Sequence, residues 1–128
     1  MAAPEQMIAA VEAYIDGFAR EDVAAVVGLF AEDAVVEDPV GGAVQRGRAA
    51  FAQFFAGTVG SGAKLTLDGP IRLGPAYAAF PFHVDLAWEG QPMCIDVIDV
   101  FHFDVSGKIR HMQAFFGERN FLPATKEA

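Results

Sequence analysis

Residues 94–104 read Cys-Ile-Asp-Val-Ile-Asp-Val-Phe-His-Phe-Asp, a stretch whose side chains alternate between the two faces of a β-strand. One face carries four apolar side chains and a single acid, namely Ile95, Val97, Asp99, Phe101 and Phe103. The other face mixes polar and apolar residues. We therefore expect the first face to point into a core, with Asp99 rather than Asp96 as the buried acid.

A buried Asp99 has to find a cationic partner or take up a proton, because an ionised carboxylate is costly in apolar surroundings. No Lys or Arg falls on a predicted inward position. The pattern therefore predicts a raised pKa and a neutral acid that can donate a hydrogen bond at pH 7. Two other interpretations stay open: a buried acid bonded to backbone or water with no catalytic role, and a bulged strand that exposes Asp99.

The rest of the second half also has the spacing of strands. Leu65 and Leu67 alternate with polar residues. A long strand before residue 94 carries Phe80, Phe82, Val84, Leu86 and Trp88 on one face. A last strand covers roughly Lys108 to Phe116, and turns are expected at Gly90-Gln91-Pro92 and over residues 104–107.

The first half has the apolar spacing of helices. One amphipathic stripe consists of Met7, Val11, Tyr14, Ile15 and Phe18. Asp22 can cap a second helix that carries Val23, Val26, Val27 and Phe30. A third helix should follow Gly47, with Phe51, Phe54 and Phe55 inward, and end near Gly57. A short extended piece over residues 34–38 comes before it. Helices followed by antiparallel strands predict an α+β fold whose sheet curls over the helices and encloses a pocket.

The composition narrows the classes of function. The 128 residues are expected to form one domain, residues 1–128. A formal net charge of −8 argues against nucleic acids and anionic membranes as partners, since both need a basic surface. The sequence has no signal peptide and no run of about 20 apolar residues, so we expect a soluble cytoplasmic protein.

Metal and disulfide chemistry is not expected. Cys94 is the single cysteine, so no intramolecular disulfide can form. His83 and His102 should face outward, while the face of His111 stays open. No spacing matches a metal-ligand set, a phosphate-binding loop or a nucleophile elbow.

Two further residues are candidates for a site beside Asp99. Tyr14 lies in the apolar stripe of the first helix, where its hydroxyl needs a partner; a tyrosine bonded to a carbonyl in the core is the alternative. Asp38 shares a face with Ala34 and Val36 and precedes Pro39, which favours extended backbone. That placement can aim Asp38 at the mouth of a pocket, and the alternative is an ordinary Asp-Pro turn.

Three segments carry these residues: Ala13-Tyr14-Ile15, residues 29–41 (Leu-Phe-Ala-Glu-Asp-Ala-Val-Val-Glu-Asp-Pro-Val-Gly), and residues 96–103 running on to Gly107-Lys108-Ile109. Residues 112–116 add to them. Together they resemble the bacterial ketosteroid isomerases (steroid Δ5-isomerases), which belong to the wider NTF2-like and SnoaL-like group of cone-shaped α+β barrels. The resemblance runs over nearly the whole chain.

The resemblance implies a cofactor-free isomerase that converts 3-oxo-Δ5-steroids into their Δ4 isomers through a dienolate. By resemblance, Asp38 is the general base that moves a proton from C4 to C6. Tyr14 and a protonated Asp99 would donate hydrogen bonds to the C3 oxygen, the arrangement for which this family is known. The resemblance also implies a homodimer, and apolar residues on the outer sheet face, Ile98 and Val100, favour the same conclusion.

A flat hydrocarbon ligand needs an apolar pocket. We expect its lining to include Phe82, Val84, Trp88, Val97, Phe101, Met112 and Phe116, although plain core positions are the alternative for each. In some relatives two further tyrosines support the tyrosine of the oxyanion hole. The matching positions here are Phe30 and Phe55, so we expect Tyr14 to act without that support.

Two other functions remain open. The first is a different enolate-forming enzyme on the same barrel, such as a polyketide cyclase, with the same Asp38 but a wider pocket. The second is a non-catalytic binding or dimerisation module, for which Asp38 would be dispensable.

Overall fold

The computed structural model of the chain describes residues 2–123. In chain order the elements are α1 (Pro4–Ala19), α2 (Val23–Val27), β1 (Phe30–Glu37), β2 (Val44–Arg46), α3 (Arg48–Gly60), β3 (Lys64–Leu67), β4 (Arg72–Leu73), β5 (Tyr77–Trp88), β6 (Gln91–Phe103), β7 (Ile109–Phe115), the 3₁₀ turn η1 (Glu118–Asn120) and β8 (Phe121–Pro123). The helices come first and long strands follow, so the predicted α+β class is confirmed.

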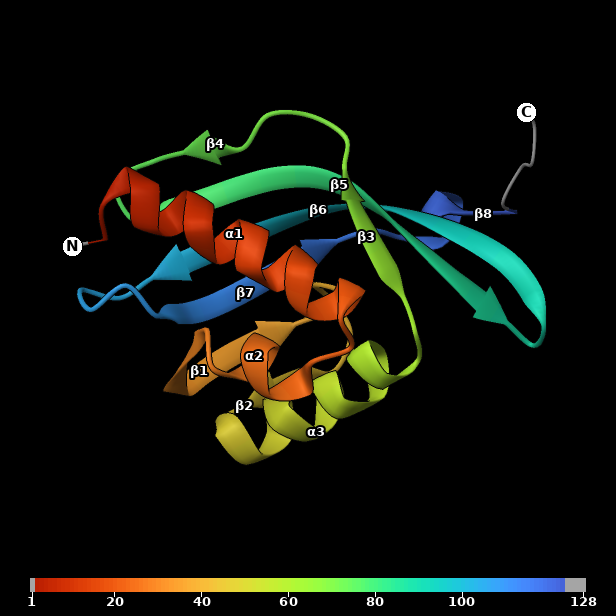
Figure 1. The fold of residues 1–128 in the computed structure, drawn as a ribbon, viewed down its shortest axis with the longest axis horizontal. Helices are drawn as coiled ribbons and strands as arrows, with labels where there is room; N and C mark the ends of the chain where they lie inside the picture. Colours follow the sequence, from red (N-terminus) through yellow and green to blue (C-terminus); the bar gives the residue numbers. More distant parts are fainter. Residues whose placement is uncertain (1, 124–128) are drawn as a thin grey trace.

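The strands of residues 2–123 form one curved sheet in the order β2-β1-β7-β6-β5-β3, with β4 beside β5 and β8 beside β6. The pairings are antiparallel apart from β1 and β7, which run parallel. The sheet is curved like a cone but is not a closed barrel, because its two edge strands, β2 and β3, do not pair with each other. In Figure 1, α1 crosses one face of the sheet, where it packs on β3 and β5, while α3 packs on β1 and β2.

α1 is an amphipathic helix in which four of the five residues of the predicted stripe are buried, while Ile15 is half-buried. Pro4 stands at its first position, where the missing backbone N–H costs no hydrogen bond. Met7, Val11, Tyr14 and Phe18 are then buried on one side of the helix. The spacing of these side chains turns Tyr14 and Phe18 toward the sheet.

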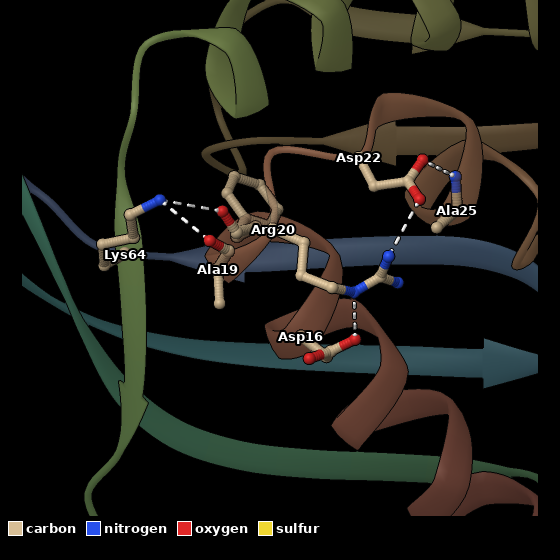
Figure 2. Close-up of polar contacts among 7 residues, drawn as sticks. Asp16, Ala19, Arg20, Asp22, Ala25 and Lys64 are labelled. Atoms are coloured by element: carbon tan, nitrogen blue, oxygen red, sulfur yellow. Dashed lines mark hydrogen bonds and ion pairs between the residues drawn. The ribbon is translucent and has the colours of Figure 1, made fainter.

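Polar contacts fix the end of α1 against its neighbours (Figure 2). Arg20 donates to the Asp22 carboxylate at 3.1 Å, and Asp22 caps α2 by accepting a hydrogen bond from the backbone N–H of Ala25 at 3.0 Å. The Asp22 cap was predicted from the sequence. The amine of Lys64, on β3, donates to the Ala19 carbonyl oxygen at 3.1 Å, which places a cation at the negative end of α1.

The longest hairpin joins β5 and β6. Its turn consists of Glu89 and Gly90, both with positive φ (50° and 80°), as a two-residue type I′ turn requires. The register is continuous, with Phe80 opposite Asp99 and Phe82 opposite Val97. Figure 1 shows the tip of this hairpin extending beyond the helices.

Several predicted boundaries were wrong. Phe30 does not end the second helix: α2 stops at Val27, and Phe30 begins β1, where it pairs with Ile109. The third helix runs to Gly60, because Gly57 is accommodated within it and Gly62, at φ +86°, takes the left-handed position after its end.

The strand ends also shift. Gln91 and Pro92 belong to β6 rather than to the turn, and the last long strand is one residue shorter at each end than expected, Ile109–Phe115. The extended piece before the third helix starts at Phe30 rather than Ala34. β2, β4 and β8 have two or three residues each, too few for an alternating pattern to show in the sequence.

Candidate active site

A largely apolar cavity of about 400 Å³ lies between the helices α1 and α3 and the strands β3, β5 and β6. Its volume is that of a site for one small organic molecule. Its lining consists of Tyr14, Phe18, Asp38, Phe54, Gly57, Thr58, Ser61, Ala63, Leu65, Phe82, Val84, Leu86, Ile95, Val97, Asp99 and Phe116. The structure thus brings all three predicted polar candidates, Tyr14, Asp38 and Asp99, to one cavity.

Asp99 is fully buried on the inner face of β6, as the alternation predicted. Its cross-strand neighbours are Phe80 on β5 and Ala114 on β7, both buried, and the pairing with β5 has no bulge at this position. Neither carboxyl oxygen has a hydrogen-bond partner among residues 2–123. Burial therefore raises the pKa of Asp99 well above its usual value, and the nearby charge of Asp38 raises it further.

Tyr14 faces Asp99's strand from α1. Its ring packs against those of Phe18, Phe55 and Phe101, with ring centroids 5.1, 6.1 and 5.1 Å away. Within residues 2–123, its hydroxyl donates only to the thioether sulfur of Met112, at 3.9 Å. Because a thioether is a weak acceptor, this phenol is free to donate to a ligand oxygen.

The pKa of Tyr14 is also raised well above its usual value. Burial is the main cause, and the negative charges of Asp99 and Asp38 add to it. The phenol is therefore a neutral hydrogen-bond donor at pH 7.

Asp38 follows the last residue of β1 and is held there by backbone contacts. Glu37 pairs with Gln113 on β7, and the backbone N–H of Val40 donates to the Ala114 carbonyl oxygen at 2.8 Å. These contacts hold Asp38 beside the end of β7, and its side chain lines the cavity. Burial raises its pKa to about 7, so a substantial fraction is ionised at neutral pH.

Of the seven apolar residues expected to line a pocket, four line this cavity and three do not. Phe82, Val84, Val97 and Phe116 line the cavity. Phe101 does not, because the rings of Tyr14 and Phe80 pack against it and fill the space beyond Asp99. Met112 lies buried behind the Tyr14 hydroxyl. Trp88 is 64% exposed near the tip of the β5–β6 hairpin and lines a separate groove.

Part of the lining was missed in the sequence. Phe54, Gly57, Thr58 and Ser61 reach the cavity from α3 at positions i, i+3, i+4 and i+7, the spacing of one helix face. The sequence predicted an inward face with Phe51, Phe54 and Phe55, and Phe54 does line the cavity. Gly57, Thr58 and Ser61 were not singled out, because small and polar side chains do not mark a core-facing side of a helix. The Thr58 hydroxyl oxygen is buried and, like the Asp99 carboxyl, has no hydrogen-bond partner among residues 2–123.

The three histidines lie outside the cavity. His83 contacts Asp68 at 2.8 Å, and His102 contacts the Gln113 side-chain oxygen at 2.8 Å. His111, whose face was left open, contacts Glu37 at 2.5 Å. Within the part of the chain that the structure describes, no three His, Cys, Asp or Glu side chains are grouped as metal ligands, and no helix is long and apolar enough to cross a membrane.

Comparison with known proteins identifies the family of this chain. The sequence model of the SnoaL-like domain matches residues 11–112, which include Tyr14, Asp38 and Asp99. The chain belongs to the SnoaL-like family. The curved sheet and N-terminal helices of this SnoaL-like domain are those expected from the resemblance.

Relatives of this SnoaL-like chain include an isomerase and a cyclase-like enzyme. The chain is 39% identical over 118 residues to a steroid Δ-isomerase of Nocardioides simplex, covering 91% of this chain and 95% of that protein. It also superposes, with a TM-score of 0.90 and 27% identity, on an epoxide hydrolase/cyclase-like enzyme with a role in pyran ring formation in the polyether salinomycin. That match covers 97% of this chain and all of the other.

The raised pKa of Asp99 has a consequence for stability. The pKa of Asp99 in the folded protein lies above the unfolded value of about 3.9, so the folded protein holds a proton there that the unfolded chain releases. At pH values between the unfolded and the folded pKa, the free energy of unfolding therefore falls by about 1.4 kcal/mol per pH unit. Asp99→Asn removes this pH dependence. As pH rises from 5 to 8, we expect the urea midpoint of the unsubstituted protein to fall relative to that of Asp99→Asn.

Asp96→Asn is the matched control, since Asp96 lies on the same strand but is exposed on the outer face. It should leave the pH dependence unchanged. Parallel curves for Asp99→Asn and the unsubstituted protein would mean that Asp99 does not take up a proton on folding.

Proposed function

We propose that this chain is a steroid Δ-isomerase that moves the carbon–carbon double bond of a 3-oxo-Δ5-steroid into conjugation without a cofactor. The observation that carries the proposal is the meeting of Tyr14, Asp38 and Asp99 at one apolar cavity, where the Asp99 carboxyl has no hydrogen-bond partner among the described residues. The relationship to a steroid Δ-isomerase over nearly the full length of both chains supports it.

The proton is moved by Asp38. In its ionised form it takes a proton from C4, beside the C3 ketone, and the electrons pass through the carbonyl to give a dienolate. Asp38 then returns the same proton to C6, which leaves the Δ4 ketone and regenerates the carboxylate. A base whose pKa lies near 7 suits this exchange, because it both accepts and releases a proton readily at neutral pH.

The negative charge of the dienolate grows on the C3 oxygen, and Tyr14 and protonated Asp99 donate hydrogen bonds to it. Both groups keep their protons because burial raises their pKa values. In a cavity that excludes water such preorganised donors are worth several kcal/mol together. Phe55, whose ring packs against that of Tyr14, and Phe30, which packs against Phe55, are fully buried and carry no hydroxyl. Tyr14 therefore donates without a supporting tyrosine chain.

The walls fit an uncharged polycyclic ligand. Phe82, Val84 and Val97 line the sheet side, and Phe54 lines the helix side. Apolar walls bind the rings by burying apolar surface rather than by hydrogen bonds. The polar groups at the Asp99 end therefore set the orientation of the ketone.

A second candidate function is supported by the structural similarity to an epoxide hydrolase/cyclase-like enzyme. Opening of an epoxide by an internal hydroxyl also needs an acid and a base, for which Asp99 and Asp38 are available. The substrate separates the two: the isomerase raises conjugated-enone absorbance when 5-androstene-3,17-dione is added, and an epoxide-opening enzyme does not.

The homodimer expected from the resemblance stays a prediction. Ile98 and Phe115, which pair across β6 and β7 on the outer face, are about half exposed and support it.

Asp38→Asn should lower kcat by several orders of magnitude, because the amide cannot accept the C4 proton. Binding of 4-androstene-3,17-dione should persist, since the apolar walls are unchanged. The enone assay and equilibrium titration measure the two effects. Asp33→Asn, on the exposed side of β1, is the control and should keep full turnover; an equally active Asp38→Asn would remove Asp38 as the base.

Asp99→Ala should lower kcat by about 10²–10³-fold, because one donor to the dienolate oxygen is lost while Tyr14 remains. Steady-state assays at saturating 5-androstene-3,17-dione measure the effect, with Asp96→Ala as control. A loss below about twofold would show that the Asp99 carboxyl does not contact the reacting oxygen.

The rate should depend on the ionisation of Asp38. Since the base must be ionised and burial raises its pKa toward about 7, kcat/KM should fall as pH drops, with a midpoint well above the usual aspartate value of about 3.9. Initial rates between pH 4.5 and 9 give the profile. A midpoint at or below pH 4 would contradict the effect of burial on Asp38.

A further inference from the structure

A second apolar groove opens at the end of the cavity opposite Asp99. It has a volume of about 220 Å³ and is lined by Leu86, Trp88, Met93, Ile95 and Phe121. Leu86 and Ile95 also line the main cavity, so the two spaces meet at these residues. The groove alone is smaller than the roughly 300–1,000 Å³ of typical ligand sites, which suits an extension of the neighbouring site.

The groove is built from the tip of the β5–β6 hairpin and from β8. β8 pairs with β6 so that Phe121 lies opposite Ile95, and β5 places Val84 on the other side of Ile95. Figure 1 shows β8 beside this hairpin, beyond the helices. The Phe121 ring also packs against that of Phe116, a residue of the main cavity, at a centroid distance of 5.7 Å.

Counting residues along β6 gives the distance of the groove from Asp99. Ile95 precedes Asp99 by four residues on β6, about 13 Å at about 3.3 Å per residue, and Met93 lies about 20 Å away. A steroid nucleus spans roughly 11 Å from the C3 oxygen to C17, nine bonds of about 1.5 Å in a zigzag. With its ketone at Asp99, a steroid thus brings C17 close to the level of Ile95, where the groove begins.

We propose that this groove binds an aliphatic side chain at C17, so that the substrates include 3-oxo-Δ5-sterols that keep a long alkyl chain. The inference rests on the proposed isomerase function. Each described residue that lines the groove is apolar, which suits a hydrocarbon chain. Trp88 and Phe121 are 64% and 44% exposed without a ligand, so an alkyl chain covers apolar surface that otherwise meets water.

Trp88 is the single tryptophan of the chain, so its fluorescence reports on the groove directly. Two product-like ketones with the same ring system serve as probes: 4-cholesten-3-one, with an eight-carbon chain at C17, and 4-androstene-3,17-dione, with a ketone there. Each is delivered from methyl-β-cyclodextrin, with cyclodextrin alone as the blank. We expect 4-cholesten-3-one to shift Trp88 emission to shorter wavelength and 4-androstene-3,17-dione to leave its wavelength unchanged.

Phe121→Ala and Leu122→Ala form a matched pair, because these neighbours on β8 are 44% and 41% exposed but lie on opposite faces of the strand. Phe121→Ala should raise the Kd of 4-cholesten-3-one about tenfold relative to that of 4-androstene-3,17-dione. Leu122→Ala should change this ratio less than about twofold. Circular dichroism verifies that both variants are folded.

Binding needs no turnover, so the outcomes separate the two proposals. If both ketones bind but Trp88 does not respond to the alkyl chain, or both β8 variants change the Kd ratio equally, the side-chain site is wrong and the isomerase proposal stands. A shift of Trp88 emission with protein concentration instead of ligand would assign the groove to a second copy of the chain and overturn the site. If neither ketone binds, both proposals fail.

Discussion

A buried carboxyl group lies where the apolar cavity ends and the solid aromatic core begins. On one side of Asp99 the inner faces of β5 and β6 line open space, and on the other side the rings of Phe80, Phe101 and Tyr14 pack together. Asp99 is fully buried, and its carboxyl oxygens have no hydrogen-bond partner in the part of the chain that the structure describes. The raised pKa, the neutral donor and the fixed direction of a bound ketone all follow from that one placement.

The same placement relates the two carboxyl groups to each other. The charge of Asp38 raises the pKa of Asp99, which holds the proton on Asp99 and leaves the charge on Asp38. In the proposed mechanism, environment rather than residue type assigns these two chemically identical groups to two tasks, base and donor. Since a SnoaL-like fold is shared by an isomerase and a cyclase-like enzyme, the fold supplies the cavity, and the groups at its closed end decide the chemistry.

The position of Asp99 could be predicted from the sequence because strand alternation has a period of two and one acid broke an apolar face. The placement of Tyr14 followed from helical spacing in the same way. The burial of Asp38 could not be predicted so firmly, since it depends on the contact of Val40 with Ala114, far away in sequence. The lining from α3 and the exposure of Trp88 depend on how elements dock and how far a hairpin projects, which periodicity does not encode.

The central claim is that Asp99 is uncharged at pH 7 in the folded protein. A titration of the carboxyl carbon of Asp99 by ¹³C NMR, with the signal assigned by its loss in Asp99→Asn, tests this claim most directly. We expect the chemical shift of the protonated acid to persist through pH 7. A shift that moves to the ionised value with a midpoint near pH 4 would contradict it.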